Sequence, residues 1–195
     1  MHCSNTNCSN KINSLYISQI LGLLGPVILG SKPSEILNIS IRDINKESKL
    51  NDIKKFFSNC SKISYRVIYM NDTSYRLLFF NKDTLNNAFT KKSINFLKFI
   101  GYPKEFCFDT YLDILVDRLH DRDFPHEIGI FLGYPLKDVV GFMGYGSHSF
   151  VKTNLWRIYG DETISNEVSQ RFLDDKYKFR AMLKNTDLND LKAII

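Results

Sequence analysis

The segment FPHEIGIFLGYPLKDVVGF, residues Phe124–Phe142, carries the densest set of structural signals in the chain. Pro125 suits the first turn of a helix, because a proline there loses no hydrogen bond and its φ is already helical. Gly133 can end that helix with a positive φ, and Pro135 can start the next one. The segment therefore predicts a short helix, a tight Gly-Tyr-Pro turn and a second helix.

The clearest β signal lies N-terminal to this segment, in residues 63–80. Both ends of that range are rich in β-branched and aromatic residues, and Asn-Asp-Thr-Ser at 71–74 supplies turn chemistry between them. A further strand is expected near residues 154–159, NLWRIY. We therefore predict an α+β fold, with a small antiparallel sheet made of the hairpin 63–80 and the strand near 154–159, covered by several helices.

The remaining segments place helices around this sheet within one domain. Residues 25–37, GPVILGSKPSEIL, contain two prolines and are expected to interrupt one helix and to start another near Pro33. A length of 195 residues suits a single core. The expected organisation is a mobile polar tail at 1–10, one α+β domain at 11–183 and a C-terminal tail at 184–195.

Charge is spread unevenly along the chain. Residues 1–100 hold 14 lysines and arginines against 6 aspartates and glutamates, whereas residues 101–195 hold 12 against 15. The basic half could favour anionic partners, but its lysine pairs fit solvated helix faces. The second helix of the 124–142 segment also offers few side chains for reading bases, so a nucleic-acid partner is not favoured.

Metal, cofactor and membrane signals are weak in this sequence. Cys3, Cys8, Cys60 and Cys107 form no C-x-x-C pair, so no metal site is predicted; a terminal site with His2 is the one alternative. No cofactor is indicated. The apolar run after Leu15 is too short and too interrupted for a membrane span, and it lacks a basic leader. These observations predict a cytoplasmic protein without a disulfide framework.

Two apparent catalytic motifs do not meet their chemical requirements. His126 and Glu127 start a pattern like H-E-x-x-H, but Ile130 occupies the place of the second histidine that a zinc site needs. The run GPVILGSK resembles a phosphate-binding loop, but Ser31 precedes Lys32 where the motif requires the opposite order.

The hypothesis that we carry forward is a small-ligand or anion site centred on the FPHEIGIFLGYP block. Arg118 and Arg122 are four residues apart, so they share a helix face just before His126. Histidines titrate near neutral pH and arginines bind carboxylates or phosphates. The candidate ligand-binding residues are Arg118, Arg122, His126, Glu127, Tyr134 and Lys32.

Three alternatives stay open beside this hypothesis. In the first, the arginines pair with Asp117, Asp121 or Glu127, and the block serves only packing. The second is a non-catalytic module that binds a protein partner through exposed aromatic residues such as Phe142, Tyr145 and Phe150. The third is an enzyme, although the residues single out no reaction or catalytic group.

Several segments of the chain closely resemble the family catalogued as domain of unknown function 3793, found mainly in clostridia and other anaerobes. The resemblance spans about Leu24 to Tyr177, and its most specific part is FPHEIGIFLGYPLKDV. It implies no activity, cofactor or catalytic residue, because none is established for the family. The matching segments, in order, are LGPVILGSKPSEIL, RVIYMNDTSYRLLFF, FIGYP, FPHEIGIFLGYPLKDVVGF and LWRIYGD.

Overall fold

The fold combines helices with two small antiparallel sheets, which confirms the α+β class. A computed structural model describes residues 14–40, 46–71, 74–121 and 123–195. The helices in this part of the chain are α1 (Ser14–Leu29), α2 (Lys46–Phe57), α3 (Lys82–Ala88), α4 (Lys91–Phe99), α5 (Phe108–Arg118), α6 (Ile128–Phe131), α7 (Leu136–Phe142), α8 (Thr163–Asn185) and α9 (Leu188–Ile194). The strands are β1 (Ser34–Ser40), β2 (Ile63–Asn71), β3 (Ser74–Asn81), β4 (Phe150–Thr153) and β5 (Arg157–Tyr159).

The larger sheet has the order β1-β3-β2, with both neighbours of β3 antiparallel to it. The predicted hairpin at 63–80 is confirmed as β2 and β3. Successive side chains of a strand point to opposite faces. Accordingly, Leu77 and Phe79 enter one buried cluster, whereas Leu78 and Phe80 enter another. The central strand is therefore buried on both faces.

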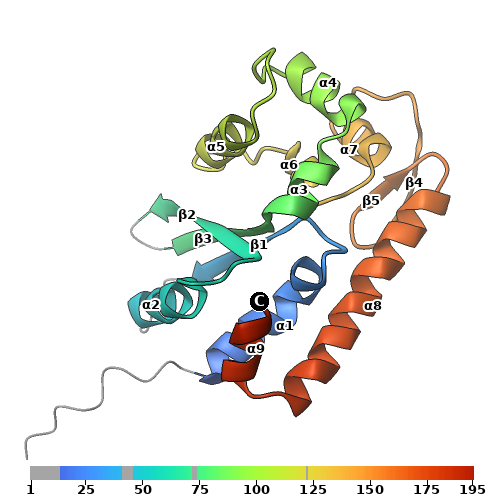
Figure 1. Cartoon of the computed structure of the whole chain (residues 1–195). Coiled ribbons are helices and arrows are strands. Elements are labelled where there is room, and N and C mark those ends of the chain that lie inside the picture. The colour runs from blue at the N-terminus through green and yellow to red at the C-terminus, as the bar shows by residue number, and fades with distance from the viewer. Residues whose placement is uncertain (1–13, 41–45, 72–73, 122) are drawn as a thin grey trace, which may run out of the picture.

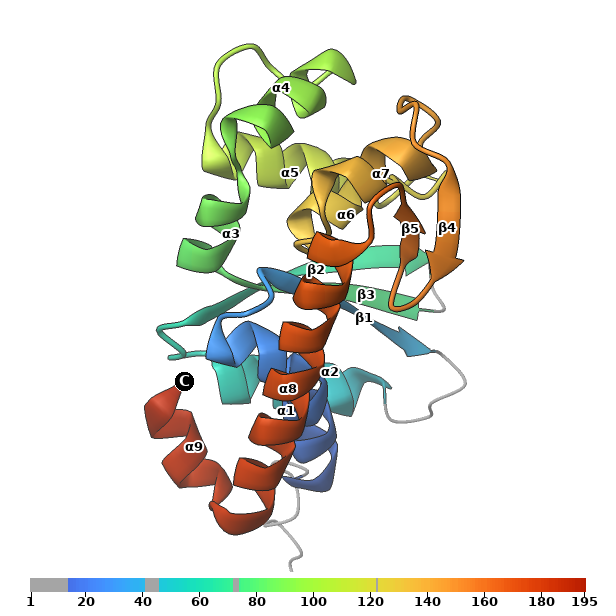
Figure 2. The ribbon, with the colours of Figure 1, turned by 90° about the vertical axis from the view of Figure 1, so that its right-hand side faces the viewer.

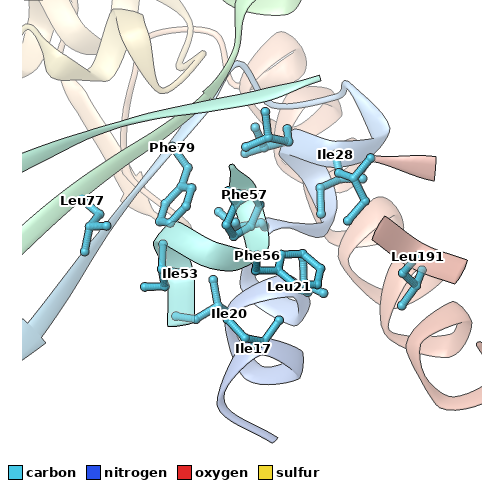
Figure 3. Close-up of a cluster of buried hydrophobic side chains, with 14 of the residues drawn as sticks. Ile17, Ile20, Leu21, Ile28, Ile53, Phe56, Phe57, Leu77, Phe79 and Leu191 are labelled. Carbon is cyan, nitrogen blue, oxygen red and sulfur yellow. The ribbon is translucent and has the colours of Figure 1, made fainter. Parts of the chain in front are cut away.

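Helices cover the two faces of this sheet as separate layers (Figure 1). Helices α1, α2 and α9 lie on one side, where their apolar residues form a core with β3; Figure 3 shows part of it, including Ile53, Phe57 and Phe79. Helices α3 to α7 lie on the other side and form the second core. Helix α8 runs along α1 (Figure 2) and buries Phe179 in the first core.

The prediction for residues 25–37 is wrong in two respects. Helix α1 continues through Pro26 to Leu29, because Leu24, Val27 and Ile28 are all buried and their packing outweighs one lost hydrogen bond. The segment after Pro33 is strand β1 instead of a new helix. Its backbone pairs with β3, about 40 residues further along the chain, and that pairing overrides the local helix-start signal.

The strand predicted near 154–159 exists as β5, but it does not join the hairpin. It pairs with β4 in a two-stranded sheet of its own, and β1 takes the third place in the larger sheet. Next to this small sheet, Trp156 and Ile158 pack against Val168 and Phe172 of α8 and form a third, smaller buried cluster. This arrangement places β5 beside α7, where the candidate site lies.

The segment after 185, expected to be a C-terminal tail, folds into α9. Leu191 and Ile195 are buried in the first core. The backbone carbonyl of Ile195 also accepts hydrogen bonds from the Lys62 N–H and from the Cys60 thiol. These bonds attach the end of the chain to the residues just before β2. In the part of the chain that the structure describes, no helix has the length and apolar character to cross a membrane.

Candidate functional site

The 124–142 segment forms two helices joined by a turn, as predicted, but Pro125 precedes the first helix instead of lying in its first turn. Helix α6 begins at Ile128, after a turn closed by the Ile128 N–H and the Pro125 carbonyl. Gly133 has a φ of 80°, as predicted, and the Tyr134 N–H returns to the Gly129 carbonyl at 2.8 Å. The Ser34 hydroxyl donates to the Phe131 carbonyl at 2.7 Å, which ties the end of α6 to the start of β1.

Arg118 and Glu127 come together, but they form an internal ion pair. The Arg118 Nη1 lies 2.6 Å from Glu127 Oε1, and Glu127 is only 4% exposed. Arg118 also donates to the Ile100 carbonyl at 3.3 Å, and its guanidinium lies 4.6 Å from the centre of the Tyr102 ring. The pair joins α5 to the start of α6. Arg118 therefore follows the first alternative above, in which it pairs with a nearby carboxylate of the same chain.

The other predicted residues do not gather at one place. Arg122 lies outside the residues that the structure describes. Lys32 is 7% exposed, forms an ion pair with Glu35 at 2.7 Å, and lines a cavity of about 190 Å³ together with Tyr134. Among the candidates that the structure describes, only His126 and Tyr134 line the larger pocket described next.

A pocket of about 410 Å³ opens between α6, α7 and β5. Figure 2 shows these elements together near the N-terminal end of α8. Apolar and aromatic side chains make up most of its wall. The residues that line it are Phe124, His126, Ile128, Gly129, Leu132, Tyr134, Asp138, Val139, Phe142, Trp156 and Arg157. The pocket thus takes most of its wall from the FPHEIGIFLGYPLKDVVGF segment.

Two aromatic contacts set the shape of this pocket. Tyr134 and Trp156 stack with their ring centres 4.5 Å apart and their planes 19° apart, which joins the α6–α7 turn to β5. Burial and, secondarily, the nearby Glu35 charge raise the pKa of Tyr134 to about 12. In the second contact, the His126 ring meets the Phe142 ring edge-on, with ring centres 4.8 Å apart.

Asp138 anchors the floor of the pocket. It is 1% exposed and accepts four hydrogen bonds. Its Oδ1 accepts from the Lys137 ammonium at 2.7 Å and from the Tyr159 N–H at 2.8 Å. Its Oδ2 accepts from the Trp156 indole N–H at 2.8 Å and from the Ser165 hydroxyl at 2.6 Å. One carboxylate therefore joins α7, β5 and the first turns of α8.

This polar cluster is suited to holding structure and not to nucleophilic catalysis. Lys137 uses its ammonium on Asp138, on the Tyr159 carbonyl and on the Ser165 hydroxyl oxygen. The Ser165 hydroxyl has no exposed surface, so a substrate cannot reach it. Because every oxygen of Asp138 is already hydrogen-bonded, the cluster keeps Trp156 in place as a wall of the pocket.

The hydrogen bonds of Asp138 predict a pH dependence of stability. Burial opposes its ionisation, but the bonds from Lys137, Ser165, Tyr159 and Trp156 outweigh burial and hold the pKa of Asp138 below its ordinary value of 3.8. A carboxylate with a lowered pKa stabilises the fold above its unfolded pKa, and that contribution is lost as the pH falls through the folded pKa.

We therefore expect the difference in unfolding free energy between wild type and Asp138→Asn to be constant from about pH 5 to 8 and to shrink below about pH 4. Urea unfolding of both proteins across this range measures it. A difference that stays constant down to pH 2 would contradict the role given to the ionised carboxylate.

Of the eleven described residues that line the pocket, only His126 and Tyr134 were among the candidate ligand-binding residues named from the sequence. Trp156 and Arg157 lie outside the 124–142 segment altogether, and their place depends on how β5 docks on α7. The Arg157 Cζ lies 5.7 Å from the Phe142 ring centre and 5.9 Å from that of Phe150, and the side chain is exposed at the pocket mouth. The one signal for them is the LWRIYGD segment, which contributes to the family resemblance. Within the described ranges, no three His, Cys, Asp or Glu side chains converge in a metal-binding arrangement; Cys3, Cys8 and His2 lie outside those ranges.

Comparison with protein families identifies the family of this chain. The family model described as Protein of unknown function (DUF3793) matches residues 20–192. The chain belongs to this family. The matched region of this DUF3793 protein includes every described residue that lines the pocket. Comparisons with curated proteins and with solved structures give no match.

Proposed function

We propose that this DUF3793 protein binds a small, largely aromatic molecule in the pocket between α6, α7 and β5. The observation that carries the proposal is the pocket itself, a hollow of about 410 Å³ with aromatic walls and few polar groups. Small-molecule sites commonly have volumes of about 300–1,000 Å³, apolar walls and a few placed polar groups. The volume and the lining both fall within that description.

The wall residues are held in place by contacts within the protein. This supports a ligand-binding pocket and not a defect in packing. The Asp138 hydrogen bonds hold Trp156, and Trp156 in turn stacks on Tyr134. A site whose walls are held in place before binding loses less side-chain entropy when a ligand enters. Phe142 is 42% exposed although it carries a large apolar ring, and a ligand in the pocket would cover part of that ring.

Truncation of one wall tests the proposal. We expect Phe142→Ala to weaken binding of indole-3-acetamide, a neutral aromatic probe, by about five-fold, because the contact between two aromatic groups is worth about 1 kcal/mol. The readout is the single tryptophan of the chain, Trp156, whose indole N–H gives one cross-peak in a ¹⁵N-labelled sample.

The matched control is Phe99→Ala, which removes an exposed phenylalanine of α4 that does not line the pocket. It should leave the dissociation constant unchanged. Equal affinities for wild type and both variants would show that the probe does not use this wall. Absence of any saturable shift in the wild type would contradict the proposed function.

The exposed aromatic residues favour a second candidate function, an interaction surface for a protein partner. Phe142, Tyr145 and Phe150 are 42%, 56% and 53% exposed. Tyr145 also packs against Phe99 with ring centres 5.3 Å apart, so the apolar surface extends onto α4. Large exposed apolar patches often mark such interfaces. A double variant, Tyr145→Ala with Phe150→Ala, leaves the pocket-lining Phe142 in place. Loss of a protein partner from this variant, with binding of the pocket probe retained, would separate this function from the first.

The cytoplasmic location and the anaerobic bacterial source expected from the sequence stay predictions. An enzymatic role is a third alternative, for which the pocket offers the His126 ring as the one exposed acid–base group among the lining residues described above.

A further inference from the structure

We infer that the ligand of this pocket carries a single negative group and that Arg157 binds it. This inference rests on the proposed function and adds the chemical class of the ligand, a small aromatic monoanion. The original hypothesis placed an anion near Arg118, but the guanidinium of that residue already forms an ion pair with the buried Glu127. A different arginine, Arg157, lies at the pocket mouth.

Arg157 has the environment that an anion-binding arginine needs. Its guanidinium lies against the faces of Phe142 and Phe150, which orients it without neutralising its charge. Across residues 14–40, 46–71, 74–121 and 123–195, no ion pair or side-chain hydrogen bond involves Arg157. Arginine offers five N–H donors in a planar arrangement that matches a carboxylate.

The carboxylate that lines this pocket is already compensated. Asp138 is the carboxylate among the residues that line the pocket, and its oxygens accept four hydrogen bonds, one of them from the Lys137 ammonium. Since Asp138 is also buried, it offers a ligand no unpaired acceptor. The charge that remains uncompensated at the pocket mouth is the positive charge of Arg157.

His126 adds a second polar group on the same rim. The Phe142 ring centre lies 4.8 Å from the His126 ring centre and 5.7 Å from the Arg157 Cζ, so both groups contact one aromatic ring. An aromatic ligand body against Phe142 would therefore have two donors close to it. Each imidazole carries at least one N–H, so His126 can donate to the same negative group.

The small number of cationic groups limits the charge of the ligand. Polyphosphate sites use several cations or a row of backbone N–H groups at a helix start or glycine-rich loop. Among the pocket-lining residues that the structure describes, Arg157 is the one lysine or arginine. One guanidinium beside an aromatic hollow fits a carboxylate or sulfonate attached to a ring system.

A matched pair of probes tests the inference. Indole-3-acetate and indole-3-acetamide have the same ring and length and differ in charge. We expect wild type to bind the acetate about five-fold more tightly, as suits one charged contact at an exposed rim. In Arg157→Gln the ratio of the two dissociation constants should fall to about one. Raising NaCl from about 0.05 to 0.5 M should weaken acetate binding alone.

Arg171→Gln is the control, because Arg171 is an exposed arginine of α8 outside the pocket lining. It should keep the preference for the acetate. Equal binding of the two probes to wild type, or a preference that survives Arg157→Gln, would overturn the inference and leave the proposed function intact. If neither probe binds to wild type, the proposed function fails and this inference fails with it.

Discussion

Replacing Gly133 with alanine is expected to lower the free energy of unfolding by about 3 kcal/mol, from two additive causes. Gly133 has a φ of 80°, a conformation that costs an L-residue about 1–2 kcal/mol. An added Cβ would also lie 2.4 Å from the Pro33 Cδ and 2.9 Å from its Cγ. The proline ring cannot rotate away, so the α6–α7 turn or the start of β1 must move.

Gly144→Ala isolates the first cause. Gly144 has nearly the same φ, 78°, but an added Cβ there meets nothing within 4 Å. We expect Gly144→Ala to lower the free energy of unfolding by only about 1 kcal/mol. Urea unfolding of wild type and both variants gives the comparison. Equal losses would mean that the turn does not pack against Pro33 as closely as described here.

The second large effect is expected at Asp138. Asp138→Ala should lower the free energy of unfolding by about 4 kcal/mol, because it leaves the partly buried Lys137 ammonium without its counter-ion. It also leaves the Trp156 indole N–H, the Ser165 hydroxyl and the Tyr159 N–H without their acceptor. The junction of α7, β5 and α8 depends on these bonds.

Asp138→Asn is expected to lower the free energy of unfolding by less than Asp138→Ala, since the amide oxygen keeps one acceptor and the side chain keeps its shape. Asp117→Ala, at an exposed carboxylate near the end of α5, should stay within about 0.5 kcal/mol of wild type. The Trp156 indole N–H resonance reports the same junction in the folded variants. A loss at Asp138 no larger than at Asp117 would contradict the anchoring role.

The parts of the fold that follow from local sequence could be predicted. The hairpin at 63–80 has strand-forming residues on both sides of a turn, and Gly133 was assigned a positive φ from its place between two helical segments. Strand β1 could not be predicted in this way. Its SEILNIS sequence follows a proline and resembles a helix start, and only pairing with β3 decides its conformation.

The sequence singled out the segment that lines most of the pocket, but among the candidate ligand-binding residues only His126 and Tyr134 are in the described lining. The 124–142 segment supplies most of the pocket wall. The sequence could not show which arginine faces the pocket, because Arg118 and Arg157 differ in their tertiary partners and not in any local sequence pattern. Arg118 meets Glu127, whereas Arg157 reaches the pocket because β5 docks beside α7 through the Asp138 bonds.

The proposed function requires that the pocket between α6, α7 and β5 receive a small aromatic ligand. The most direct test is an NMR titration of ¹⁵N,¹³C-labelled protein with indole-3-acetate to about 10 mM, well above a millimolar dissociation constant. We predict a saturable shift of the Trp156 indole cross-peak, with nuclear Overhauser effects from the probe ring to the methyl groups of Leu132 and Val139. An unmoved Trp156 cross-peak, or contacts from the probe only to other surfaces, would contradict it.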